Sequence, residues 1–191
     1  MPTVPFVASD AIRAVFSAAM SAMYRNEVPA YGTLMELVAD INAATLDKQP
    51  ELRASLEATE TLDRICEERH GAIRLGTEAE LAMMRRVFAV MGMFSVGYYD
   101  LSEAGVPVHS TAFRPVGEEA LKVNPFRVFT SLLRLDLIAD PELRAAAREI
   151  LARRRIFSDS AVALVVQAER DGGLSQEDAG RFVAEVLNTF R

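Results

Sequence analysis

The spacing of apolar residues changes once along the chain, a little over a third of the way from its start. Before that point they recur at helical spacing, with one stripe over residues 9–25, a second over residues 33–46, and a third helix that begins at Pro50. After it, no repeat of 3.6 residues fits residues 70–75, and glycine punctuates this short run. We therefore expect an N-terminal helical segment over residues 1–69, followed by a strand.

The chain beyond this strand combines one helix with three β-like segments. Thr77 followed three residues later by Glu80 fits a capping box, which opens a helix whose apolar stripe ends at Gly92. The predicted order is strand, helix, strand, strand, strand, over residues 70–75, 77–91, 93–101, 106–116 and 126–138. One helix between the first two of these strands indicates a curved mixed sheet. The predicted fold class is α+β, with a βαβββ-like module over residues 70–138.

Helices return over residues 139–191 and form a C-terminal layer within the same domain. Three N-cap signals mark where they begin, at Asp140, Ser158 and Ser175. Residues 153–155, all arginine, close the first of these helices, where cations complement the carbonyl end of the helix dipole. The apolar stripe of the last helix reaches the penultimate residue without a stop signal. We therefore expect exposed apolar surface here that a further portion of protein would cover.

The first strand divides its side chains between two faces. His70, Ala72 and Arg74 point one way, because alternate side chains of a strand share a side, and Ile73 and Leu75 point the other way. The imidazole and the guanidinium lie roughly 13 Å apart along the backbone, at about 3.3 Å per residue. An imidazole can hold a metal and a guanidinium can grip a carboxylate, which suits a metal site for an anionic substrate. The alternative is a solvated polar face on an edge strand.

The composition narrows the class of protein. The chain has 191 residues, enough for one domain with a substantial core, and half of them are apolar. Its formal net charge of -6 argues against nucleic acid as the main partner, because phosphate binding needs a basic stripe. The single cysteine, Cys66, fits a reducing compartment, and charged residues interrupt the apolar residues near the N-terminus. We expect a cytoplasmic protein without a membrane partner.

The histidine count limits the metal chemistry that the chain can support. Common catalytic signatures such as H-E-x-x-H, G-x-S-x-G and the P-loop do not occur in the sequence. A non-haem iron site of the facial-triad type needs two histidines and a carboxylate. His70 and His109 are the two histidines of the chain. His109 is either a hydrogen-bonded strand residue or a second metal ligand, and the spacing does not decide between them.

Several stretches of the chain together carry a resemblance to a known family. The chain resembles the 2-oxoadipate dioxygenase/decarboxylase family in the stretches SAMYR, VPAYGTL, RHGAIR, VHSTAFRP and FRVFTSL, and the resemblance extends over nearly its whole length. It implies a vicinal-oxygen-chelate-like fold, in which βαβββ modules pair to form a partly closed sheet around a metal. It also implies Fe(II) held by two histidines and a glutamate, and conversion of 2-oxoadipate and O2 to 2-hydroxyglutarate and CO2 in lysine degradation.

The resemblance extends to individual residues. His70 matches the first metal-binding histidine of the family, and Arg74 matches the arginine that grips the substrate, which makes it the catalytic candidate. The family's other histidine and its glutamate fall beyond Arg191, because its members are much longer and the chain resembles their N-terminal portion. We therefore expect the remaining portion of such an enzyme to be a partner of this chain. We also expect the chain alone to be nearly inactive.

The expected substrate has groups that suit these residues. A 2-oxo acid can chelate Fe(II) through its carboxylate and keto oxygens and leave a position for O2. The second carboxylate of 2-oxoadipate can accept two parallel hydrogen bonds from a guanidinium such as that of Arg74. Ser110, Thr111 and Arg114 are further substrate-binding candidates, which would line the same cavity.

Two other classes of function stay open at this point. One is a non-enzymatic module that binds a 2-oxo acid without iron, or an incomplete N-terminal fragment without activity of its own. The other is a small self-contained enzyme in which His70, His109 and an acidic residue form the site, with two copies paired across a dimer axis. Stoichiometric iron that is lost separately in variants of either histidine would favour the second class.

Overall fold

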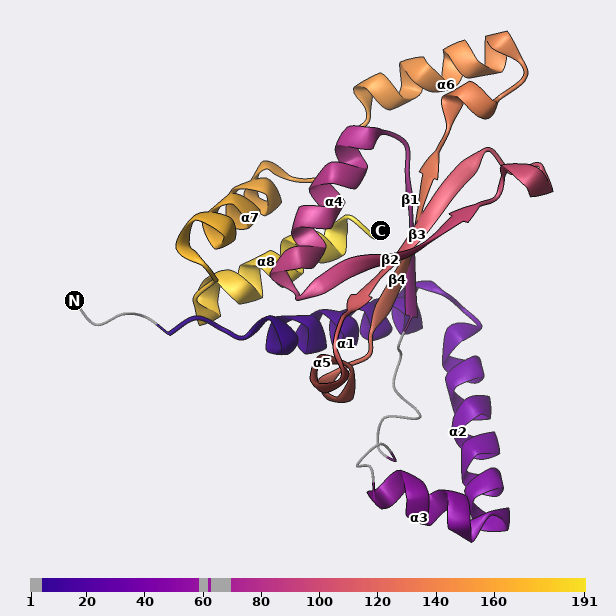
Figure 1. Cartoon of the computed structure of the whole chain (residues 1–191), viewed down its shortest axis with the longest axis vertical. Coiled ribbons are helices and arrows are strands. Elements are labelled where there is room, and N and C mark those ends of the chain that lie inside the picture. The colour runs from indigo at the N-terminus through magenta and orange to yellow at the C-terminus, as the bar shows by residue number, and fades with distance from the viewer. Residues whose placement is uncertain (1–4, 59–61, 63–69) are drawn as a thin grey trace. The chain divides into compact units, whose positions relative to one another are not determined.

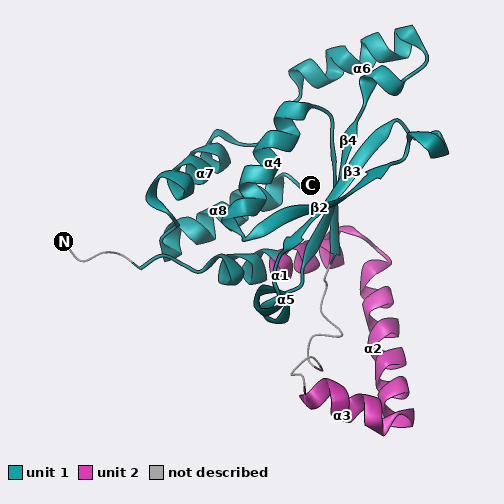
Figure 2. Ribbon diagram, in the orientation of Figure 1, with its two compact units in different colours: residues 1–16, 70–191 teal, residues 17–69 magenta. Residues whose placement is uncertain are grey.

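The computed structural model describes residues 5–58, 62 and 70–191. The chain divides into two compact units, one formed by Met1–Phe16 with His70–Arg191 and the other by Ser17–Arg69 (Figure 2). The boundary after residue 69 coincides with the change of period in the sequence. The division into an N-terminal segment, a central module and a helical layer stays a prediction. Cys66 and most of the predicted helical segment beyond residue 58 lie outside the described residues.

The N-terminal helices form where the apolar stripes predict them. They are α1 (Ser9–Glu27), α2 (Tyr31–Lys48) and α3 (Pro50–Ala58), and α1 is shared between the two units. Met20 and Met23 of α1 are buried, as core methionines at this spacing should be. The stripe of α2 behaves differently: Leu34, Leu37 and Ile41 are each more than half exposed. Helical periodicity therefore predicted the helix correctly but did not show which stripe is buried.

A mixed sheet of four strands forms the larger unit, as predicted. The strands are β1 (His70–Leu75), β2 (Met93–Asp100), β3 (Val108–Pro115) and β4 (Arg127–Leu133). Their order in the sheet is β1-β4-β3-β2. β1 runs parallel to β4, whereas β4 with β3 and β3 with β2 are antiparallel. The last strand along the chain therefore lies between the first and the third.

The predicted order of elements misses one short helix. α5 (Glu118–Val123) lies between β3 and β4, so the module reads strand, helix, strand, strand, helix, strand. A helix of six residues has too few positions to show an apolar stripe, which explains the omission. The fourth strand also ends earlier than predicted, and a 3-10 turn, Leu135–Leu137, follows it.

Helix α4 (Glu78–Val90) begins and ends as its sequence predicts. The Thr77 hydroxyl accepts a hydrogen bond from the Glu80 amide at 3.1 Å, and Gly92 takes a positive φ of 65° just past the helix end. In a complete capping box the Glu80 side chain would accept a hydrogen bond from the Thr77 amide, but here it does not. The Glu80 carboxylate accepts from the amide of Gly76, at 2.6 Å, so it holds the end of β1 rather than its own N-cap residue.

Three further helices complete the unit, and each begins at the predicted cap. They are α6 (Pro141–Arg153), α7 (Asp159–Asp171) and α8 (Gln176–Asn188), with side-chain caps from Asp140, Ser158 and Ser175. α4 packs against β1 and β2, α7 packs against α4, and α8 against α7. Figure 1 shows α4, α7 and α8 on one side of the sheet and α6 at the top of the view, above α4 and the strands.

The apolar stripe of α8 is covered within this unit, so the expectation that it would be exposed is wrong. Phe182, Val183 and Val186 are buried. Beyond the helix, the Phe190 ring lies edge-on to Phe16 at 5.5 Å, and α1 therefore covers the end of the stripe. None of the helices in the described parts of the chain is both long enough and apolar enough to span a membrane.

Candidate functional site

The sheet has one face packed against helices and one face that carries arginines. On β1, Ile73 and Leu75 are buried, whereas His70, Ala72 and Arg74 are exposed, which confirms the predicted division of side chains. We call the side of His70 and Arg74 the arginine face. Strand pairing extends it across the sheet, since residues in register point to the same side. Besides His70 and Arg74 it carries Phe94, Tyr99, Ser110, Arg114, Arg127, Phe129 and Ser131.

Register places the polar residues of this face in two rows. In one row, His70 lies beside Arg127, and Arg114 follows on the next strand. In the other row, Arg74 lies beside Ser131, which is in register with Ser110. Sequence reasoning missed Arg127 and Ser131. Alternation along β4 predicts that Arg127 and Ser131 share one face of that strand. It does not predict that β4 pairs with β1, and this pairing is what places the two residues beside His70 and Arg74.

Arg74 borders a cavity of about 560 Å³ on this face. The cavity lining is largely apolar and includes Phe129, Leu133 and Val108, with Ser131 as a polar contact. The Ser110 hydroxyl donates to the Ser131 hydroxyl at 3.2 Å. Within the described residues, the Arg74 guanidinium makes no ion pair and no side-chain hydrogen bond. A cation without an internal partner at the rim of an apolar cavity is suited to an anionic ligand with a hydrocarbon chain.

The remaining substrate-binding candidates, Ser110, Arg114 and Thr111, do not lie together at one place on the sheet. Ser110 contacts Ser131, the register partner of Arg74, but it is not among the residues that line the cavity bordered by Arg74, which contradicts the expectation that it would line that cavity. Arg114 lies on the same face but in the row of His70, and it donates to its neighbour's carbonyl, Pro115 O, at 2.9 Å. Thr111 is on the opposite face, where its hydroxyl donates to Gly97 O at 2.9 Å. The expectation that Thr111 lines the same cavity is therefore wrong, because consecutive strand residues point to opposite sides.

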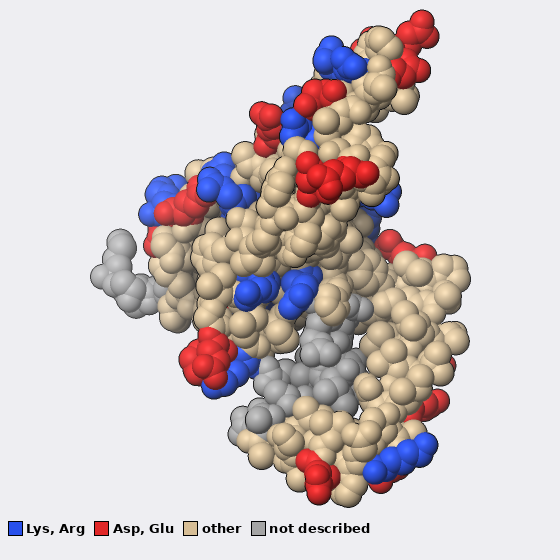
Figure 3. Space-filling model, turned by 45° about the vertical axis from the view of Figure 1, so that its right-hand side comes forward, with Lys and Arg blue, Asp and Glu red and all other residues tan. Residues whose placement is uncertain are grey.

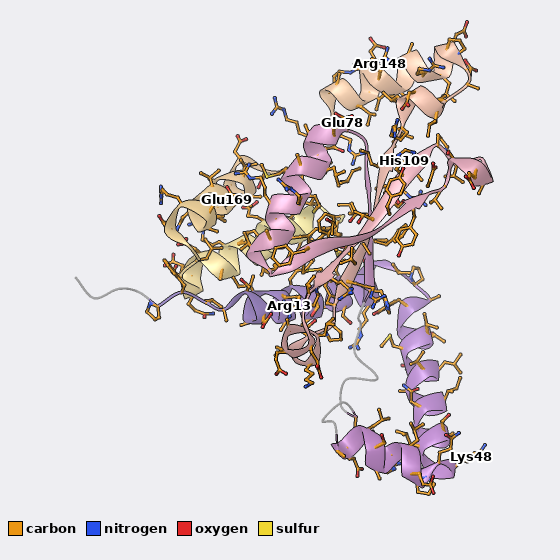
Figure 4. The ribbon with its side chains drawn as sticks, viewed as in Figure 1. Arg13, Lys48, Glu78, His109, Arg148 and Glu169 are labelled. Atoms are coloured by element: carbon orange, nitrogen blue, oxygen red, sulfur yellow. The ribbon has the colours of Figure 1, made fainter. Side chains whose placement is uncertain are left out.

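His109 is a hydrogen-bonded strand residue on the helix-packed face. Its Nδ1 lies 2.6 Å from an Arg134 nitrogen and 3.0 Å from the Tyr98 hydroxyl. Because a guanidinium can only donate, Nδ1 is an acceptor in this contact. Figure 4 labels His109 together with Glu78, and both line a second cavity of about 340 Å³. The sheet separates His109 from His70, so the two histidines of one copy cannot hold the same ion.

The charges around His109 are already balanced by neighbours. Arg134 forms a two-pronged contact with Asp136, at 2.9 and 2.6 Å, which holds the pKa of that carboxyl below its ordinary value. Hydrogen bonds from the Ser102 hydroxyl and amide lower the pKa of Asp100. These groups form a local network of paired charges, whereas Arg74 on the arginine face makes no ion pair within the described residues.

The arginine face is electropositive. The positions on its strands include His70, Arg74, Arg114 and Arg127, and none of the positions brought into register there is Asp or Glu. Phe94 and Tyr99 add exposed apolar area, at 53% and 47% exposure. Figure 3 shows both signs of charge at the top of the molecule, and below it a largely uncharged surface with separate basic and acidic patches.

The described residues do not form a complete metal site. Within residues 5–58, 62 and 70–191, no three His, Cys, Asp or Glu side chains lie together in a group that could hold an ion. His70 is the one histidine on the arginine face. An exposed imidazole there can supply one ligand, whereas a facial triad needs three.

Comparison with known proteins agrees with this geometry. The sequence profile of the 2-oxoadipate dioxygenase/decarboxylase family matches residues 16–191. A protein of that name from Pseudomonas putida is 60% identical over 191 residues, which are 100% of this chain and 41% of the relative. The crystal structure of hydroxyglutarate synthase from Pseudomonas putida in complex with 2-oxoadipate matches with a TM-score of 0.94 at 61% identity, over 97% of this chain and 41% of that chain.

A more distant structure supports the fold class. A glyoxalase-superfamily protein from Ralstonia eutropha JMP134 matches with a TM-score of 0.50 at 18% identity, over 82% of this chain and 50% of that chain. This likeness shows the fold alone. The chain spans about two fifths of the length of the curated Pseudomonas putida relative. Since the family profile covers nearly all of its residues, the chain belongs to the 2-oxoadipate dioxygenase/decarboxylase family.

Proposed function

We propose that the native polypeptide carrying this chain converts 2-oxoadipate and O2 to 2-hydroxyglutarate and CO2, and that this chain supplies the substrate-gripping arginine and one metal ligand. Family membership and the 2-oxoadipate complex of a 61% identical structure support the reaction class. The observation that carries the proposal is the position of Arg74, a guanidinium that has no ion-pair partner among the described residues and lies on the same strand face as His70.

The arginine face suits both parts of this substrate. A carboxylate can accept two parallel hydrogen bonds from Arg74, each contributing about 1.5–3 kcal/mol because it joins charged groups. Phe129 and Leu133 offer apolar surface to the methylene chain, and the Ser131 hydroxyl offers a further donor. We assign Arg74 to the distal carboxylate, because it lies roughly 13 Å along the strand from His70, where the 2-oxo end would be held.

His70 would hold Fe(II) together with ligands from outside the described residues. Fe(II) in a site of this kind supplies activation of O2 beside a chelated 2-oxo acid. His70 faces the cavity side of β1 and its imidazole can donate a nitrogen ligand. The remaining ligands belong to the further portion of the native polypeptide, which we propose as the partner of the arginine face. A cytoplasmic location stays a prediction.

The atom balance of this reaction gives a direct test. When 2-oxoadipate loses its first carboxylate as CO2, three of its oxygens remain, and 2-hydroxyglutarate contains two more. Both atoms of O2 therefore enter the product. Purified native polypeptide supplied with Fe(II) and ¹⁸O2 should yield 2-hydroxyglutarate that carries two labelled oxygens, one of them in its new carboxylate.

Two outcomes would contradict the proposal. Product without label, with O2 consumption absent, would exclude dioxygenation. Tight binding of 2-oxoadipate without any turnover would favour the alternative of a non-enzymatic binding module. The incomplete metal site of the described residues favours that alternative for the isolated chain, so the assay must use the native polypeptide.

A further inference from the structure

The end of β1, just after Arg74, is held by two residues from other elements. Arg154, the first residue after α6, donates through a terminal nitrogen to the carbonyl oxygen of Arg74 at 3.0 Å. Its Nε lies 3.2 Å from a carboxylate oxygen of Glu80, and the other oxygen of that carboxylate accepts from Gly76 N at 2.6 Å. Arg154 and Glu80 together therefore fix the backbone on both sides of Leu75.

Glu80 depends on Arg154 for its charge balance. The side chain of Glu80 is 9% exposed, and its Oε1 makes no hydrogen bond even though it lies within ion-pair distance of Arg154. Among the described residues, Arg154 is the one cation within 4 Å of this carboxylate. A buried carboxylate without a cation is strongly unfavourable, so the ion pair fixes the positions of both side chains, Glu80 and Arg154.

Side-chain packing at the same point adds to this fixation. A Cβ atom added to Gly76 would lie 2.1 Å from Leu151 Cδ2, so the α6 side chain occupies the space that a larger residue would need. Leu151 and Arg154 both line the cavity that Arg74 borders. The arginine run at residues 153–155 therefore does more than complement a helix dipole. Its middle residue reaches β1.

The charge of Arg154 excludes it as the main anion site. Its guanidinium is balanced by Glu80, whereas that of Arg74 has no acidic neighbour among the described residues. We propose that Arg154 is a positioning residue, which acts with Glu80 to fix the β1 backbone so that Arg74 meets the substrate carboxylate. This inference rests on the function proposed above. Removal of Arg154 should misplace Arg74 and lower kcat/KM for 2-oxoadipate about ten- to a hundredfold.

A double-mutant cycle in the native polypeptide separates positioning from general stability. Arg154→Met should lower kcat/KM, but it should cause little further loss in a variant that already carries Arg74→Lys, because residues that act as a unit are not additive. Glu80→Gln added to Arg154→Met removes the unbalanced buried charge. It should restore thermal stability and leave the loss of kcat/KM in place. Arg153→Met is the matched control, since Arg153 donates to Glu149 of its own helix.

These results would overturn the inference: losses from Arg154→Met and Arg74→Lys that multiply, activity that recovers together with stability, or an equal loss from Arg153→Met. Amide hydrogen exchange at Gly76 provides a readout independent of turnover. Exchange should become at least about tenfold faster in Arg154→Met and stay unchanged in Arg153→Met. Unchanged exchange would overturn the inference. Faster exchange in a protein that does not turn over 2-oxoadipate would support the fixing of the β1 backbone by Arg154 and would reject the proposed function.

Discussion

At the scale of single residues, His70 and Arg74 share one strand face, and the proposed function gives them separate roles. Arg74→Lys keeps the charge and loses the planar fork that matches a carboxylate, so it should not behave as a conservative change. We expect kcat/KM for 2-oxoadipate to fall at least about tenfold, which corresponds to about 1.4 kcal/mol. Iron content should stay near that of the wild type. Full efficiency, or loss of iron, would show that Arg74 does not grip the substrate as proposed.

The two histidines should respond differently to substitution because the sheet separates them. His70→Ala should remove both bound iron and turnover in the native polypeptide. His109→Ala should keep both, because His109 bonds Tyr98 and Arg134 on the opposite face. Metal analysis and turnover of the two purified variants test this pair. Equal loss of iron in both variants would favour a site that joins the histidines across two copies.

Strand alternation predicted the positions of some site residues but not of others. Alternation placed His70 and Arg74 on one face correctly, because side-chain direction on a strand is a local property. Strand alternation also excludes a shared face for Ser110 and Thr111, because they are consecutive residues. Both were candidates because the family resemblance covered the whole stretch VHSTAFRP. Arg127 could not be predicted, because its place beside His70 depends on a parallel pairing between strands far apart in sequence.

At the scale of elements, one buried arginine joins three helices. The Arg13 side chain of α1 is fully buried and donates to the carbonyls of Met91, Ala120 and Asn124 at 2.9–3.0 Å. These carbonyls lie at or near the ends of α4 and α5, and Asp10 balances the charge at 2.6 Å. Arginine is suited to this place because its guanidinium has five donors.

Substitution of Arg13 should lower the stability of the folded protein. Arg13→Met leaves three carbonyls without their donor, and we expect the free energy of unfolding to fall by about 3 kcal/mol or more. Urea denaturation measures the change. Arg170→Met is the control, since Arg170 is 70% exposed and pairs with its neighbour Asp171, and it should cost less than about 1 kcal/mol. Equal effects of the two substitutions would contradict a structural role for the Arg13 network.

The joint between α7 and α8 should make stability depend on acid pH. Hydrogen bonds from the Gln167 amide and the Ser175 hydroxyl lower the pKa of Asp178 in the folded protein. The resulting stabilisation is fully present above the unfolded value of about 3.9 and is lost as pH falls through the lower folded value. The difference in melting temperature between wild type and Asp178→Asn should therefore shrink below about pH 4. A difference that stays constant would contradict this.

Local signals predicted the elements better than their burial. The caps at Thr77, Asp140, Ser158 and Ser175 were correct, because capping depends on a few neighbouring residues. Which apolar stripe is covered depends on distant partners. The stripe of α8 is buried with help from Phe16, whereas the stripe of α2 is largely exposed, and neither outcome is encoded in the stripe itself.

At the scale of the whole molecule, the proposed function requires the chain to carry part of a site. The arginine face exposes Phe94, Tyr99 and Phe129, and the described residues supply one histidine there without a complete ligand set. We expect the isolated chain to fold but to turn over 2-oxoadipate at least a thousandfold more slowly than a typical enzyme rate of about 10 per second. Turnover and iron content, measured beside the native polypeptide, test this. A typical rate from the isolated chain would contradict it.

The central claim is that the arginine face holds the substrate through Arg74. A crystal structure of the native polypeptide with 2-oxoadipate bound tests it most directly. We predict a substrate carboxylate that accepts two hydrogen bonds from the Arg74 guanidinium, at about 2.7–2.9 Å, on the side of the sheet that carries His70. A ligand bound instead in the cavity beside His109, or bound without contact to Arg74, would contradict the account.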